Sequence, residues 1–76
     1  MLQLSVEFDH EADGRWIASV PALARVHVYG GTRDDAIAKV VALVYATLAD
    51  EVSHGERDSV SLGDLKLDFG APEKAA

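Results

Sequence analysis

The stretch RWIASVPALARVHVYGGTRDDA, residues Arg15–Ala36, contains the strongest structural signals in the chain. It predicts a strand over Arg15–Val20, a loop that begins at Pro21, a strand over Val26–Tyr29, a Gly-Gly turn and the start of a helix. Proline cannot donate a hydrogen bond to a sheet ladder, so Pro21 ends the first of these strands. Side chains alternate along a strand, so Trp16 shares a face with two apolar neighbours and is expected in the core.

The chain before this stretch predicts one further strand. Residues 2–9 alternate between apolar and polar side chains, as in a strand with one face on a core. Asp13-Gly14 then favours a tight hairpin turn, because both residues tolerate a positive φ. We therefore expect a three-stranded antiparallel meander.

A helix is expected to begin immediately after the Gly-Gly turn. Thr32 is a good N-cap, and Asp35 lies three residues on, which is the spacing of a capping box. The helix is expected to run from Arg33 to Ser53 and to end before Gly55, a natural left-handed position. A closing strand then completes a β-β-β-α-β fold of the α+β class.

The helix is apolar on two sides. Its expected core-facing stripe follows helical spacing and is widened by three neighbours: Ile37, Val41, Val44, Leu48 and Val52, with Ala36, Val40 and Leu43. A second stripe of the same spacing, here called the helix back, consists of Ala38, Ala42, Tyr45 and Ala49. Alanines are good helix formers at exposed positions, but small residues beside a tyrosine also suit a contact with another chain. We favour the second interpretation, an oligomer interface.

Two segments after the helix compete for the last strand. Ser59–Leu62 and Leu65–Phe69 both alternate, and Gly63-Asp64 separates them. We favour Ser59–Leu62, although the pair could also form a hairpin across the Gly-Asp turn. Residues 1–70 are expected to form a single domain and residues 71–76 a flexible tail.

Composition limits the classes of function. The 76 residues carry a net charge of −6 and no cysteine, so disulfides and thiolate metal sites are excluded. An acidic domain repels nucleic-acid phosphate and attracts a basic protein, although acidic surfaces also simply keep proteins soluble. A core this small is marginal, and a homo-oligomer, most simply a two-fold dimer, is the expected support.

Neither a signal peptide nor a membrane span is expected. The N-terminus has no basic segment before its alternating strand. The longest apolar run, Val40–Ala46, is far short of the roughly 20 residues that a bilayer requires. A cytoplasmic location is therefore expected.

The ionisable residues form no catalytic pattern. Glu7, Asp9 and Glu11 lie along the first strand and its turn, and a metal nuclease would need such carboxylates to converge. Charged residues on an open sheet face are, however, normally solvated. The three histidines lie in different elements without a metal-ligand spacing. We expect no catalytic residue, no metal and no cofactor.

The open face of the sheet is the expected partner-binding surface. By strand alternation it carries four residues that suit an interface: Arg15, Ile17, His27 and Tyr29. Interfaces favour Tyr and Arg, although an ordinary solvated sheet face could carry the same residues.

The central stretch also keeps the order and spacing of a longer motif, D-G-x-W-x-A-x-V-P-x-L-P-G-x-x-x-x-G-x-T-x-x-E-A, followed by a long helix. The matching positions are Asp13, Gly14, Trp16, Ala18, Val20, Pro21, Leu23, Gly30, Thr32 and Ala36. In this respect the chain resembles the N-terminal domain of HicB-family antitoxins over roughly Val6–Gly55. It departs at Ala24-Arg25, where the family has Pro-Gly, and at Asp35, where the family has Glu. The first departure implies a differently shaped loop before the third strand.

The resemblance implies a truncated ribonuclease H-like fold and a function. Family members neutralise HicA, a small basic RNA-cleaving toxin, by covering its active site. Full-length members add a DNA-binding module, and because the chain ends before one, no direct DNA binding is expected. The expected function is that of a non-enzymatic antitoxin of a type II toxin–antitoxin system, with a HicA-like toxin as its partner. The alternative is an orphan oligomeric structural or ligand-binding module of the same fold.

Overall fold

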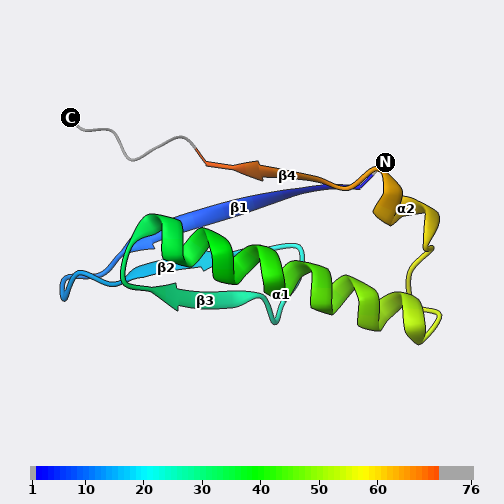
Figure 1. Cartoon of the computed structure of the whole chain (residues 1–76), viewed down its shortest axis with the longest axis horizontal. Helices are drawn as coiled ribbons and strands as arrows, with labels where there is room; N and C mark the ends of the chain where they lie inside the picture. The colour runs from blue at the N-terminus through cyan, green and yellow to red at the C-terminus, as the bar shows by residue number, and fades with distance from the viewer. Residues whose placement is uncertain (1, 71–76) are drawn as a thin grey trace.

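The computed structural model describes residues 2–70, which form a four-stranded sheet with one long helix against it (Figure 1). The strands are β1 (Gln3–His10), β2 (Trp16–Ser19), β3 (His27–Gly30) and β4 (Lys66–Phe69). The helices are the long α1 (Arg33–Ser53) and the one-turn α2 (Val60–Gly63), both between β3 and β4 in the chain. The expected α+β class is confirmed. The expected tail, residues 71–76, lies outside the described residues.

The sheet is mixed and has the strand order β3-β2-β1-β4. β1 pairs with β2, and β2 with β3, in antiparallel registers that place Ile17 between Asp9 and Tyr29. β4 is parallel to β1, with Leu4 opposite Leu67. The sheet therefore differs from the three-stranded meander of the prediction, because β4 joins the free edge of β1 and extends it. The segment that contains α1 supplies the long crossover that a parallel strand requires.

The choice of Ser59–Leu62 as the last strand is wrong. Val60–Gly63 forms α2, and Lys66–Phe69 provides the strand. Ahead of α2, the Oδ1 of Asp58 accepts a hydrogen bond from the backbone N–H of Val60 at 3.0 Å, which tightens the turn that leads into this helix. The chain must return from the end of α1 to the start of β1, where β4 begins beside Gln3. The tight turn of α2 completes this return.

The core lies between α1 and the inner face of the sheet. Its buried side chains are Leu4, Val6, Ala18, Val20, Leu23, Val26, Ala36, Val40, Val44 and Leu48. α1 packs on β2 and β3, so it covers this half of the sheet more fully than the β1–β4 half (Figure 1). Trp16 lies at the margin of the core, half-buried, and its ring stacks on that of His10 with the centroids 4.4 Å apart.

The predicted limits of the long helix are confirmed. The Oγ1 of Thr32 accepts a hydrogen bond from the backbone N–H of Asp35 at 3.0 Å, which makes Thr32 the N-cap. The carboxylate of Asp35 accepts from the N–H of Gly31 at 3.1 Å, one residue before the position that a capping box uses. Gly55 follows the helix with a φ of 72°, the expected left-handed conformation. No helix among the described residues combines the length and apolar character needed to cross a membrane.

The helix is rotated relative to the expected core-facing stripe. Its buried row consists of Ala36, Val40, Val44 and Leu48. Ile37, Val41 and Val52, which were expected at the centre of the stripe, are only half-buried. The reason lies at Gly30, where a Cβ would lie 2.5 Å from the backbone nitrogen of Ala36. This close approach of β3 to the first turn of α1 fixes which side of the helix faces the sheet.

Candidate binding surface

The outer face of the sheet, turned away from α1, brings the four predicted partner-binding residues together. The register places Ile17 of β2 opposite Tyr29 of β3, and His27 lies two residues before Tyr29 on the same face. The Cζ of Arg15 lies 4.8 Å from the centroid of the Tyr29 ring, a cation–π distance. The His27 and Tyr29 rings meet edge to face with their centroids 5.3 Å apart. We call Arg15, Ile17, His27 and Tyr29 the sheet-face cluster.

The turn between β1 and β2 holds Arg15 in position. Gly14 has a φ of 95°, which confirms the predicted turn and suits glycine. The Nε of Arg15 donates to the carboxylate of Asp13 at 2.9 Å, and its Nη2 lies 3.9 Å from that of Glu11. The backbone N–H of Arg15 also donates to Asp13, and this bond chiefly lowers the pKa of Asp13 below its usual value. The guanidinium is therefore placed over the Tyr29 ring before any partner binds, which reduces the entropy that binding would cost.

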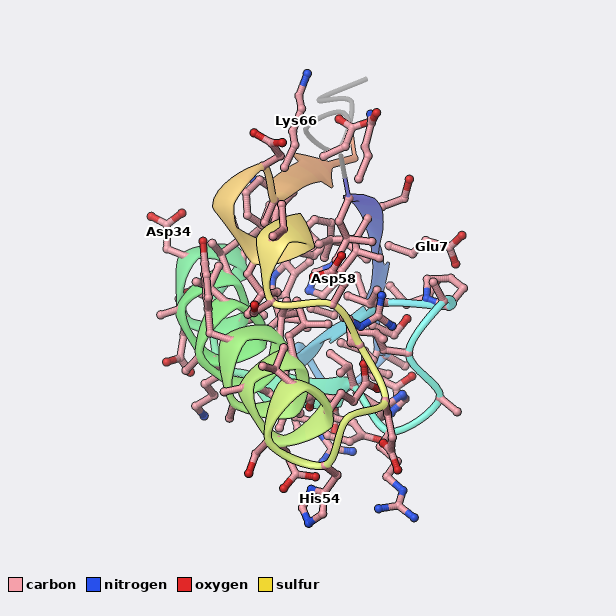
Figure 2. All side chains as sticks on the ribbon, turned by 90° about the vertical axis from the view of Figure 1, so that its right-hand side faces the viewer. Glu7, Asp34, His54, Asp58 and Lys66 are labelled. Atoms are coloured by element: carbon pink, nitrogen blue, oxygen red, sulfur yellow. The ribbon has the colours of Figure 1, made fainter. Side chains whose placement is uncertain are left out.

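The β1–β4 half of the outer face is acidic. Asp9 lies opposite Ile17, and Glu7 precedes it by two residues on the same face of β1. Figure 2 shows Glu7 pointing away from α1. Asp68 adds a third carboxylate from β4. Nowhere in residues 2–70 do three or more potential metal-ligating side chains gather closely enough to hold an ion.

The helix back faces away from the sheet, on the opposite side of the molecule from the sheet-face cluster. Its four residues, Ala38, Ala42, Tyr45 and Ala49, are all exposed. Tyr45 is 51% exposed and Tyr29 is 42% exposed. The two tyrosines are therefore similarly exposed but lie on opposite faces of the molecule, so substitutions at the two positions can be compared directly.

Sequence reasoning did not foresee a cleft between the β2–β3 loop and the C-terminal end of α1. It has a volume of about 440 Å³ and is lined by Leu23, Ala24, Arg25, Thr47, Asp50, Glu51, His54 and Glu56. The Nδ1 of His54 lies 2.8 Å from the backbone carbonyl of Asp50 and 3.3 Å from its carboxylate, and both raise the pKa of His54. The one signal in the sequence was Ala24-Arg25, where the chain departs from the HicB pattern.

Comparisons of the chain with protein-family models, with curated proteins and with solved structures find no match. The likeness to HicB antitoxins therefore rests on the motif of the central stretch.

Proposed function

We propose that this chain is a HicB-like antitoxin, a non-enzymatic cytoplasmic protein that neutralises a basic HicA-type RNA-cleaving toxin by direct contact. The observation that supports this most is the sheet-face cluster, in which an arginine, two aromatic rings and an isoleucine gather on the sheet face turned away from α1. Tyrosine and arginine dominate the centres of protein interfaces. The sheet with α1 across it is also compatible with the truncated ribonuclease H-like fold that the motif implies.

The charge of the chain supports a basic partner. The net charge is −6, and Glu7, Asp9 and Asp68 lie on the same face as the cluster. Complementary charge around an interface speeds the encounter and fixes its orientation. The same charge opposes binding to nucleic-acid phosphate, so we expect a protein partner and no direct contact with DNA.

The geometry of the outer face favours binding over catalysis. Glu7 and Asp9 are exposed, whereas catalytic carboxylates usually lie in clefts where burial and neighbouring charges shift their pKa. The lowered pKa of Asp13 comes chiefly from a hydrogen bond within a turn, and that of Asp35 from the N–H of Gly31 before α1. Both shifts therefore accompany local structure.

Co-expression with a small basic toxin encoded by the neighbouring gene tests the proposal. The chain should co-purify with that toxin and restore the growth that the toxin arrests. Tyr29→Ala removes the centre of the cluster and should weaken binding about thirtyfold, the usual effect of truncating a central interface tyrosine by about 2 kcal/mol. Tyr45→Ala is the matched control and should bind as the unchanged chain does.

Two outcomes would contradict the proposal at different levels. If the toxin neither binds nor loses its effect on growth, the antitoxin function is wrong. If it binds, but Tyr45→Ala weakens binding and Tyr29→Ala does not, the function stands and the helix back replaces the sheet face as the contact.

A second candidate function is that of an oligomeric module without a toxin partner. The observation in its favour is the helix back, where a half-exposed tyrosine lies among three exposed alanines on a side of α1 that none of the residues 2–70 covers. Ala42→Glu should then weaken self-association, because it places a charge in the middle of the contact. A neighbouring gene that encodes no small basic protein would favour this candidate over the antitoxin.

A further inference from the structure

Among residues 2–70, β4 ends the sheet with an unpaired edge. The backbone N–H of Lys66 donates to the carbonyl of Leu2 at 2.8 Å, and that of Gly70 donates to Val6 at 3.2 Å. Because backbone groups alternate in direction along a strand, the N–H and C=O of Leu67 and Phe69 point away from β1. In the part of the chain that the structure describes, no strand pairs with β4 on this side. Figure 1 shows β4 at the margin of the sheet, beside β1.

The other edge of the sheet is protected. At β3 the Nζ of Lys39 reaches from α1 and donates to the backbone carbonyl of Tyr29 at 3.2 Å. A lysine over an edge is a common device against pairing with another chain. The difference between the two edges singles out β4 as the place where a further strand can add.

We propose that a second copy of the chain pairs with β4, antiparallel, on a two-fold axis that passes through Leu67. The inference is independent of the antitoxin proposal, because it concerns only the contact between two copies, and it places that contact at β4 instead of at the helix back. A two-fold axis uses the same surface on both copies, so the assembly closes as a dimer. The eight strands of the two copies would then form one continuous sheet.

The charges of β4 select this register. With Leu67 on the axis, Lys66 lies opposite Asp68 of the second copy and Asp68 lies opposite Lys66 of the second copy. Opposite charges at facing positions of an antiparallel pair are favourable, and like charges are unfavourable. If the axis moved by one residue to Asp68, the two copies of Asp68 would face each other. Because both residues are exposed on the outer face, the charges are available to a second copy.

The backbone also fits this register. The outward N–H and C=O of Leu67 can exchange hydrogen bonds with those of Leu67 of the second copy. The N–H of Phe69 can donate to the carbonyl of Leu65 of the second copy. By symmetry, the N–H of Phe69 of the second copy can donate to the carbonyl of Leu65 of the first. The N–H of Leu65 needs no new partner, because it already donates to the carbonyl of Leu62 at 3.3 Å.

Apolar contact on the inner face adds to the pairing. Leu67 and Phe69 are only half-buried, because α1 packs on β2 and β3 rather than on this half of the sheet. The Phe69 ring lies 6.5 Å from that of Phe8, between centroids. In the dimer, Leu65 of the second copy would lie beside Phe69, so the pairing would bury apolar surface that the isolated chain leaves partly in water.

Charge reversal tests the register without disturbing the fold. Within the chain, Lys66 faces Gln3 and Asp68 faces Ser5, both uncharged, so reversal should leave the β1–β4 pair intact. Sedimentation equilibrium of the full chain should give a dimer. Lys66→Asp and Asp68→Lys should each weaken it about tenfold, because each replaces two attractive pairs by two repulsive ones. The double variant K66D/D68K should restore the dissociation constant to within about twofold, since each cross-strand pair again has opposite charges.

Ala42→Glu on the helix back is the control and should leave the dimer unchanged. The proposal fails if the chain is a monomer at a concentration of 100 micromolar, or if K66D/D68K associates no better than the single variants. It also fails if Ala42→Glu dissociates the dimer while Asp68→Lys does not, since the contact would then lie on the helix back.

Discussion

Replacing Gly30 with alanine should destabilise the fold, while the same change at the adjacent Gly31 should not. A Cβ on Gly30 would lie 2.5 Å from the nitrogen and 2.9 Å from the Cα of Ala36, and 3.0 Å from the carbonyl carbon of Asp35. All three atoms belong to the backbone of the first turn of α1. No side-chain rotation can therefore relieve the contact, and the whole helix start must move away from β3.

The magnitude follows from the cost of overpacking. Extra methyl groups forced into a packed site cost about 1 to 3 kcal/mol. In a domain of this size each kcal/mol lowers Tm by about 4 to 8 °C, so Gly30→Ala should lower Tm by about 5 to 20 °C. At Gly31 a Cβ would meet no atom within 4 Å, and its φ is not positive, so Gly31→Ala should keep Tm or raise it slightly.

Thermal unfolding followed by circular dichroism at 222 nm provides the measurement. The two variants change the unfolded chain in nearly the same way, so their difference isolates the contact with Ala36. Equal values of Tm for Gly30→Ala and Gly31→Ala would show that the contact between Gly30 and Ala36 is not tight. The close approach of Gly30 to Ala36 could then not be the cause of the rotation of α1.

Two further predictions concern single side chains. Arg33 donates to the carbonyl of Gly70 at 3.1 Å, and its Cζ lies 4.5 Å from the centroid of the Phe8 ring. Arg33→Gln should therefore speed amide exchange in β4 more than in β2. Equal protection of β4 in Arg33→Gln and in the unchanged chain would show that this contact does not hold β4. The raised pKa of His54 means that the folded state holds the proton more tightly, so His54 adds stability below its usual pKa of about 6.5 and loses that contribution as the pH rises through the folded-state value. Urea unfolding of the chain and of His54→Gln should therefore differ most near pH 5 and converge at alkaline pH; a difference that grows with pH would contradict this sign.

The sequence predicts what local signals determine. The alternation of residues 2–9, the Asp13-Gly14 turn and the cap at Thr32 each depend on a few neighbouring residues. The three antiparallel strands and both ends of α1 agree with the prediction for this reason. Strand parity also placed Arg15, Ile17, His27 and Tyr29 on one face. The β2–β3 register agrees for the last three residues, and the contact of Arg15 with the Tyr29 ring agrees for the first.

The sequence does not predict what distant contacts determine. Ser59–Leu62 and Leu65–Phe69 alternate equally well, and only pairing with β1 separates them. The rotation of α1 depends on the contact between Gly30 and Ala36, which no helical pattern contains. The hydrogen bond from Arg33 to the carbonyl of Gly70 joins residues that are 37 positions apart in the sequence.

The same division applies to the surfaces. The membership of the sheet-face cluster follows from parity, but the position of Arg15 over the Tyr29 ring depends on how the turn folds around Asp13. The cleft beside His54 needs the loop before β3 to approach the end of α1. The position of this loop beside the helix depends on tertiary packing, which residue spacing does not predict.

The antitoxin proposal can be tested by titrating this chain into an RNA-cleavage assay of a small basic toxin encoded by the neighbouring gene. We expect cleavage to stop when the chain matches the toxin in amount, to require much more of Tyr29→Ala, and not to occur when the chain alone is mixed with RNA. Cleavage that continues in a large excess of the chain, or RNA cleaved by the chain itself, would contradict it.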